Sequence, residues 1–202
     1  MKLYYSPGAC SLSPHIVLHE AGLAYTPVLA STKSHKLQDG TDFYSINPLG
    51  YVPVLELDDG TRLREGPAIV QYLADQAPHK NLAPANGTLA RYRLQEWLTF
   101  IGTEIHKGFS PLFKPGTPED YKPQVREQLL SRLQWVDGEL AHKSYLMGEH
   151  FSVADAYLFT VTNWAAYVQL DISGLKNLAA YRERIAARPA VQAAMKAEGL
   201  LK

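Results

Sequence analysis

The pattern of hydrophobic residues changes near residue 80, and this change limits the possible folds more than any other feature of the chain. Up to about Ala77, short strand-like segments alternate with helical ones. From residue 88 onward only helical spacing remains. A segment rich in Pro, Asn and Gly lies between the two parts. We therefore predict two domains, residues 1–78 and 88–202, joined by a linker at residues 79–87.

The order of elements predicts the class of each domain. The first part has strand patterns at 2–5, 25–29, 54–57 and 61–64. A helix that ends at Gly22 lies between the first two strands, and another helix at 67–75 follows the last strand. This β-α-β-(α)-β-β-α order predicts a thioredoxin-like α/β domain. The second part predicts an all-α domain, with helices near 88–113, 123–140, 178–187 and 189–197 and one that opens at Ser152. Ser152 and Asp155 form an acidic variant of a capping box, which we interpret as structural.

Composition excludes several classes of function. The chain has 202 residues, 46% of them apolar, which is enough for packed cores. Lys plus Arg equals Asp plus Glu at 20 each, so no overall field attracts nucleic acid or an anionic membrane. No signal-peptide pattern opens the chain, and no apolar run approaches the ~20 residues of a membrane span. We expect a cytoplasmic protein that binds neither nucleic acid nor membrane.

The single cysteine, Cys10, stands where a strand and a turn lead into a helix. Free N–H groups in the first turn of a helix stabilise a thiolate. Cys10 and Ser13 have the spacing of the thioredoxin-type Cys-x-x-Cys, with Ser in place of the second cysteine. Dithiol exchange within the chain is thus impossible, and a small external thiol such as glutathione is the leading partner. The alternative is that Cys10 is a small buried hydrophobic residue.

Two further segments suit the binding of a small peptide. Pro53 enters a strand, and a cis Val52-Pro53 bond would turn the Val52 backbone outward to pair with an extended peptide. The alternative is an ordinary edge-strand proline. Glu65 and Gly66 precede a helix whose first N–H groups attract a carboxylate, while Glu65 can hold an ammonium. Alternatively, Glu65 only complements the helix dipole.

His106 lies in the long predicted helix, where a lone histidine is usually a surface or core residue. A polar strip with steps of three to four residues suggests a further role, because such a strip suits a cleft wall or a subunit contact. The residues of this strip are Arg91, Gln95, Thr99, Gly102, Thr103 and His106.

Five motifs together make the chain recognisable: Tyr5–Leu12, Asn47–Pro53, Glu65–Leu73, Glu104–Phe109 and Phe151–Tyr157. Their order and composition resemble the bacterial beta-class glutathione transferases, and especially members associated with biphenyl and chlorobiphenyl breakdown. The resemblance implies the glutathione transferase fold, a homodimer, and glutathione as co-substrate without a metal.

The resemblance also assigns roles to residues. Cys10 and His106 would be catalytic, with Cys10 forming a hydrogen bond or a mixed disulfide with the glutathione sulfur. The residues implied to bind glutathione are Cys10, His35, Tyr51, Val52, Glu65, Gly66, Thr99, Thr103, Glu104, Ile105 and His106. The chain departs from the family at His35, where relatives often have lysine, and at Thr99, where they have a longer polar residue.

The expected function is conjugation of glutathione to electrophilic substrates, including halogenated aromatic ones, with reductive dehalogenation as a related reaction. Two alternatives stay open. One is a glutathione-dependent thiol-disulfide oxidoreductase in which Cys10 is glutathionylated. The other is a non-catalytic glutathione-binding or regulatory module, because a fold does not determine a function. The sequence does not identify the electrophile, nor the balance among these activities.

Overall fold

A four-stranded mixed sheet forms the centre of the first of two units in the computed structural model, which describes residues 1–201. The strands are β1 (Lys2–Tyr5), β2 (Thr26–Leu29), β3 (Val54–Glu56) and β4 (Arg62–Leu63), in the order β2-β1-β3-β4. β1 pairs parallel with β2 and antiparallel with β3, which pairs antiparallel with β4. This is the predicted thioredoxin-like arrangement.

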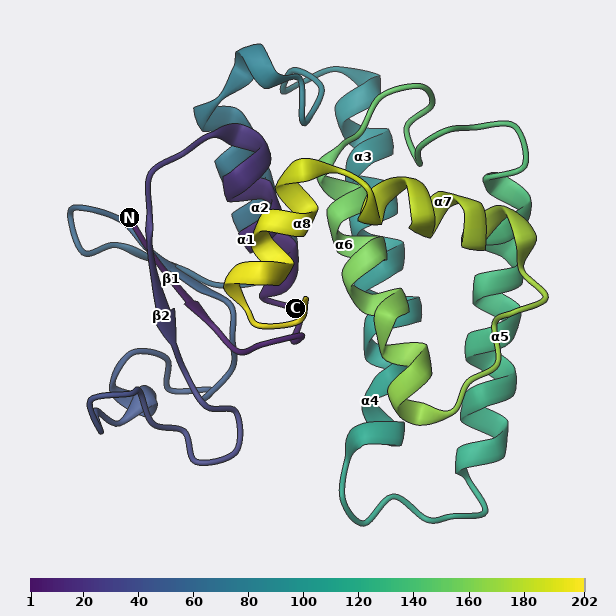
Figure 1. The fold of residues 1–202 in the computed structure, drawn as a ribbon, viewed down its shortest axis with the longest axis horizontal. Helices are drawn as coiled ribbons and strands as arrows, with labels where there is room; N and C mark the ends of the chain where they lie inside the picture. The colour runs from purple at the N-terminus through teal and green to yellow at the C-terminus, as the bar shows by residue number, and fades with distance from the viewer. Residues whose placement is uncertain (202) are drawn as a thin grey trace. The chain divides into compact units, whose positions relative to one another are not determined.

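Three α-helices belong to the same unit: α1 (Leu12–Ala21), α2 (Gly66–Gln76) and α8 (Pro189–Ala197). α1 ends as predicted, because Gly22 adopts the left-handed conformation with φ 68°. The expected element between β2 and β3 is a single 3-10 turn, η1 (Phe43–Ser45), and a second 3-10 turn, η2 (Pro78–Lys80), follows α2. α8 lies beside α1 (Figure 1).

The compact units divide the chain differently from the predicted domains. The first unit comprises residues 1–83 together with the segment from residue 188 onward, and the second comprises residues 84–187. The last helix was expected in the second domain, but its buried residues Val191 and Ala194 belong to the first unit. An ion pair supports this placement, since the Arg188 guanidinium contacts the Glu20 carboxylate of α1 at 2.6 and 2.9 Å.

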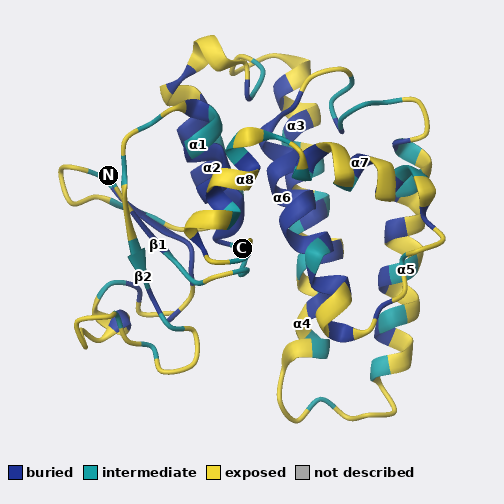
Figure 2. Cartoon of the chain, in the orientation of Figure 1, coloured by how far each residue is buried: buried dark blue, intermediate teal, exposed yellow. Residues whose placement is uncertain are grey.

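The second unit is all helical, as predicted. It contains α3 (Leu89–Phe100), the π-helical segment η3 (Ile101–His106), α4 (Lys107–Phe113), α5 (Lys122–Glu139), α6 (Val153–Thr162), the 3-10 segment η4 (Asn163–Val168) and α7 (Lys176–Ala186). Every residue of α6 is buried, so this helix forms the core of the unit (Figure 2). None of the helices formed by residues 1–201 is long and apolar enough to cross a bilayer.

The capping box at the start of α6 is confirmed. Asp155 is fully buried, and its Oδ2 accepts hydrogen bonds from the Ser152 backbone N–H at 2.7 Å and from the Ser152 hydroxyl at 2.8 Å. Its Oδ1 accepts from the Leu146 N–H at 2.8 Å and from the Tyr181 hydroxyl at 3.0 Å. The carboxylate thus connects the loop before α6, the helix itself and α7.

The predicted helix at 88–113 is one continuous helical stretch, but its middle is π-helical. Its buried apolar side chains are Leu94, Leu98, Ile101, Ile105 and Phe109. The helical spacing of apolar residues in the sequence also predicts burial of Leu89 and Tyr92, but these side chains are 73% and 60% exposed. A π-helical segment holds more residues per turn than an α-helix, so regular α-helical spacing does not describe the whole stretch.

Candidate functional site

Cys10 follows a tight turn that leads from β1 into α1. The Ala9 N–H donates to the Ser6 carbonyl at 3.0 Å, and the Ser11 hydroxyl contacts both the N–H and the carbonyl of Ser6 at 3.1 and 3.2 Å. Ser11 is the N-cap residue of α1, so half-buried Cys10 stands one residue before the helix cap. The predicted position of the thiol at a helix start is therefore confirmed.

The Cys10 thiol lies against the segment that precedes β3. Its Sγ donates a hydrogen bond to the Val52 carbonyl at 3.2 Å, and the Val52-Pro53 bond is cis, as predicted. The fold thus brings together two of the predicted segments, which are 42 residues apart in the chain. A carbonyl accepts from a thiol but not from a thiolate, so ionisation of Cys10 requires this hydrogen bond to break.

Glu65 is held in an unusual backbone conformation at the start of α2. Its φ is 65°, in a region that residues other than glycine rarely occupy, and such strain costs on the order of 1–3 kcal/mol. The Glu65 carbonyl accepts from the N–H groups of Ala68 and Ile69, both at 3.0 Å, while its side chain is exposed. Gly66 occupies the first helical position, where the N–H has no acceptor within the helix. The start of this 11-residue helix therefore presents N–H groups beside an exposed carboxylate.

His35 and Tyr51 belong to the long connection between β2 and β3. The His35 ring stacks on Tyr44 with ring centres 4.7 Å apart, and its Nδ1 is buried with no hydrogen-bond partner. Gly50, with φ 68°, permits this packing, because a Cβ there would lie 2.9 Å from His35 Nδ1. Tyr51 is 66% exposed, and its carbonyl accepts from the Asn47 side-chain amide at 2.8 Å.

His106 is enclosed by aromatic residues of the second unit. Its Nδ1 lies 2.6 Å from the Tyr157 hydroxyl, and its ring centre lies 4.9 Å from that of Trp164. Burial, with a smaller contribution from the positive charge of Lys107, lowers the pKa of His106 to about 4. The imidazole is therefore neutral at physiological pH, and it can donate through one N–H but carries no charge.

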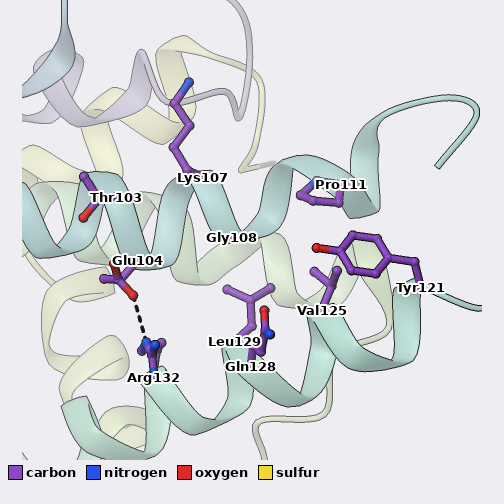
Figure 3. Close-up of a pocket in the computed structure, with 10 residues that line it drawn as sticks. All are labelled: Thr103, Glu104, Lys107, Gly108, Pro111, Tyr121, Val125, Gln128, Leu129 and Arg132. Carbon is purple, nitrogen blue, oxygen red and sulfur yellow. Dashed lines mark hydrogen bonds and ion pairs between the residues drawn. The ribbon is translucent and has the colours of Figure 1, made fainter. Parts of the chain in front are cut away.

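The other predicted residues of this helix face in different directions. Thr103 and Glu104 are exposed and line a cavity of about 250 Å³ between α4 and α5. There the Glu104 carboxylate contacts the Arg132 Nε at 2.9 Å (Figure 3). The exposed residue Thr99 accepts from the Thr103 hydroxyl through its carbonyl at 3.0 Å. Ile105 is fully buried in the core, so its side chain is not available to a ligand.

Comparison with known proteins identifies the family. Residues 8–76 match the glutathione S-transferase N-terminal domain, and residues 100–189 match the C-terminal domain. Over 200 residues the chain is 51% identical to glutathione S-transferase GstA of Escherichia coli O157:H7, covering 99% of this chain and all of that protein. The chain belongs to the glutathione S-transferase family.

Solved structures of transferases agree with this assignment. The ternary complex of BphK, a bacterial transferase, is 56% identical with a TM-score of 0.97, covering 98% of this chain and 100% of that one. The bacterial beta-class transferase of Sphingomonas chungbukensis is 50% identical with a TM-score of 0.96, and each chain is fully covered. The resemblance to the beta class, the transferase fold and the enzyme class are thereby confirmed.

In this glutathione S-transferase, sequence reasoning missed the surroundings of His106. Tyr157 and Trp164, its two contacts, come from α6 and η4, more than 50 residues later in the chain. Phe109 and Phe113 continue the aromatic cluster, with ring centres 5.7 and 5.8 Å from that of Trp164. The sequence makes Phe109, Phe113 and Trp164 plausible walls of an electrophile pocket, but it favours core positions for them and does not place them beside His106. Among residues 1–201, no group of three or more His, Cys, Asp or Glu side chains is arranged to hold a metal.

The lowered pKa of His106 predicts a measurable dependence on pH. In an NMR titration, the His106 imidazole should protonate near pH 4 and not near 6.5. The unfolded chain binds this proton near pH 6.5, so the stability linked to neutral His106 is complete above that pH. It should be lost as pH falls toward 4, at a cost of up to about 3 kcal/mol. The His106→Asn variant identifies the resonance by its absence, and a midpoint near 6.5 would contradict the burial seen here.

Proposed function

We propose that this transferase conjugates glutathione to electrophilic substrates, with Cys10 contacting the glutathione sulfur. The observation that carries the proposal is the Cys10 thiol at the start of α1, hydrogen-bonded to the carbonyl that precedes the cis-proline. A solved sphingomonad transferase, 49% identical with a TM-score of 0.96, is a complex with glutathione, which supports the choice of co-substrate.

In the proposed complex, the cysteinyl unit of glutathione pairs with the Val52 backbone as an added strand. This pairing occupies the Val52 carbonyl, so the Cys10 thiol is released from it and turns to the glutathione sulfur. The γ-glutamyl ammonium contacts Glu65, and its carboxylate accepts from the Gly66 N–H at the start of α2. The strained backbone of Glu65 supports this role, because such strain clusters at ligand sites.

His106 is proposed as the second catalytic residue. If the Tyr157 hydroxyl donates to Nδ1, the proton of the neutral imidazole is on Nε2, which then donates to the sulfur anion. Such a donor stabilises the thiolate by a hydrogen bond. Because the imidazole is neutral, it forms no ion pair that would make the sulfur anion less reactive. His35, Tyr51, Thr99, Thr103, Glu104 and Ile105 remain proposed contacts, with Ile105 restricted to its backbone.

The finer parts of the proposal concern substrate, assembly and location. The aromatic cluster around Trp164 supports planar aromatic electrophiles, including halogenated ones, with reductive dehalogenation as a related reaction. We also propose a homodimer, in which Thr99 or Thr103 contacts the partner's glutathione, and a cytoplasmic location that keeps Cys10 reduced.

Thiol-disulfide exchange is the second candidate function. Half-buried Cys10 at a helix start suits attack on a disulfide, and Ser13 stands where a dithiol enzyme has its second cysteine. A mixed disulfide between Cys10 and glutathione would then be released by a second glutathione.

Retention on immobilised glutathione, followed by turnover assays, tests the proposal. Conjugation predicts turnover of a chlorinated nitroaromatic acceptor, and exchange predicts turnover of hydroxyethyl disulfide. Retention without either turnover would indicate a non-catalytic binding module. Failure of retention would contradict both enzymatic proposals.

The Glu65→Gln variant tests the glutathione contact itself. Losing one charge-assisted hydrogen bond costs about 1.5–3 kcal/mol, so the KM for glutathione should rise roughly 10- to 150-fold while kcat changes less. Glu96→Gln, which changes the same charge on an exposed helix position, is the control and should leave KM unchanged. An unchanged KM in Glu65→Gln would remove Glu65 from the site.

A further inference from the structure

The side chain of Ser13 is a buried hydroxyl that lies one turn after Cys10. Ser13 is 1% exposed, and its Oγ has no hydrogen-bond partner among residues 1–201. A hydroxyl that is removed from water without a partner costs stability, so such a group calls for an explanation. The neighbouring hydroxyl of Ser11 is different, because it contacts both the N–H and the carbonyl of Ser6.

The backbone places Ser13 on the same side of the chain as Cys10. The Leu12 N–H donates to the Ala9 carbonyl at 3.0 Å, and the Ser13 N–H donates to the Cys10 carbonyl at 3.2 Å. Both bonds join residues three positions apart, which is the 3-10 pattern, and in this pattern side chains at i and i+3 eclipse each other. The Ser13 hydroxyl and the Cys10 thiol therefore extend from the same face of the helix start.

The bonding requirement of the Cys10 sulfur reverses when the thiol ionises. In the structure its Sγ is a donor, bound to the Val52 carbonyl at 3.2 Å. A thiolate has no proton to donate and only accepts hydrogen bonds, so the sulfur anion needs donors in place of this carbonyl. Of the Ser11 and Ser13 hydroxyls, only that of Ser13 is not already engaged by a described residue.

We propose that the Ser13 hydroxyl donates a hydrogen bond to the Cys10 thiolate and is a further catalytic residue for thiol chemistry. This bond forms only after the proton has left the sulfur, so its whole strength favours ionisation. The serine then does not resolve a mixed disulfide, as the second cysteine of a dithiol enzyme does, but helps the first sulfur to ionise. The inference rests on the proposed role of Cys10 in exchange, although ionisation can be measured without any turnover.

Other titratable groups lie on the elements around this turn. They are Tyr5 at the end of β1, His15 on α1 and Glu198 directly after α8. The Tyr5 ring centre lies 5.3 Å from that of His15, whose Nδ1 lies 2.8 Å from Glu198 Oε1. These groups are the same in every variant tested, so differences between the variants come from the substituted serine.

Ser13→Ala removes the hydroxyl alone. Because this oxygen has no partner among the described residues, the melting temperature should stay unchanged or rise. The rate at which Cys10 displaces iodide from iodoacetamide is measured against pH, without glutathione. A hydrogen bond is lost from the thiolate form only, so the midpoint should lie about one to two pH units higher than in the wild type. Both proteins should react at similar rates once their thiols are fully ionised.

Ser11→Ala is the matched control, because it removes the other serine hydroxyl beside Cys10. This hydroxyl accepts from the Ser6 N–H at 3.1 Å, so its loss leaves a backbone donor without its acceptor. The melting temperature should therefore fall, which is the opposite of the result expected for Ser13→Ala. The midpoint of alkylation should move clearly less than in Ser13→Ala.

Ser13→Cys tests the juxtaposition of the two side chains directly. If they eclipse, the introduced thiol should displace glutathione from the mixed disulfide that Cys10 forms with oxidised glutathione. The two sulfurs form one bond, and their two hydrogen atoms leave on two molecules of glutathione. Mass spectrometry should find a chain lighter by two hydrogen atoms. In the control Ser11→Cys, the neighbouring Cα atoms are about 3.8 Å apart, too close for an ordinary disulfide, so the adduct should persist.

Three results would overturn the proposal. The first is an alkylation profile of Ser13→Ala that coincides with that of the wild type, which would make the hydroxyl a feature of packing alone. The second is a fall in melting temperature as large as in Ser11→Ala, and the third is a persistent glutathione adduct in Ser13→Cys. Absence of hydroxyethyl disulfide turnover in the wild type would refute the proposed exchange activity, whereas the alkylation profile would still decide the role of Ser13.

Discussion

Replacing Cys10 by alanine is expected to abolish thiol-disulfide exchange while leaving measurable conjugation. In exchange, Cys10 itself forms the mixed disulfide, and the chain has no other cysteine to replace it. In the proposed conjugation, the glutathione sulfur attacks, and the backbone N–H groups of α1 and the His106 imidazole would still stabilise its anion. Hydroxyethyl disulfide turnover should therefore fall to the uncatalysed background, and mass spectrometry should find no glutathione adduct.

Cys10→Ser is the matched variant, because it keeps a donor for the Val52 carbonyl but removes the nucleophilic sulfur. It should lose exchange as completely as Cys10→Ala and bind glutathione normally. If conjugation disappears together with exchange in both variants, Cys10 is required for both reactions. Persistent exchange in purified Cys10→Ala would refute the redox role of this residue.

Replacing Asp155 by alanine is expected to destabilise the second unit by about 3–5 kcal/mol, the cost of breaking a buried charged network. The carboxylate accepts four hydrogen bonds, and its removal leaves the buried donors of Leu146, Ser152 and Tyr181 without it. Desolvation raises the pKa of Asp155 despite these donors, which shows how fully the group is removed from water. Urea unfolding monitored by circular dichroism measures the loss.

Asp171→Asn is the control for this experiment. Asp171 also accepts a backbone N–H, from Ser173 at 2.9 Å, but it is exposed. Its replacement should change stability by no more than about 0.5 kcal/mol. Equal effects of the two substitutions would mean that burial of the Asp155 network contributes nothing to stability.

Local chemistry explains which parts of the fold could be predicted from the sequence. The end of α1 at Gly22 and the start of α6 at Ser152 depend on a few neighbouring residues, and both were placed correctly. The hairpin of β3 and β4 likewise depends on a local turn, where Gly60 has φ 84°. These helix ends and this hairpin could therefore be predicted from the sequence.

Contacts between distant segments could not be predicted in this way. The apolar face of α8 indicates that the helix packs, but not on which surface, and its actual neighbour α1 lies more than 160 residues earlier. The same holds for Glu198 and His15, which are 183 residues apart. For the candidate site, motifs in the sequence suggest the residues, whereas the partners that set their orientation could not be predicted. The positive φ of Glu65 also carried no signal in the sequence.

The π-helical turn at Ile101–His106 determines the direction in which the His106 side chain points from the helix axis. A π-helical turn adds about one residue to an α-helical turn, and one residue of an α-helix corresponds to about 100° of rotation. Everything after the turn is thus rotated as a block relative to α3. A homologue with one residue fewer in this stretch could keep every side chain of the site and still direct its histidine away from Tyr157 and Trp164. The contacts of His106 with Tyr157 and Trp164 therefore depend on the number of residues in the π-helical segment as well as on the identity of those residues.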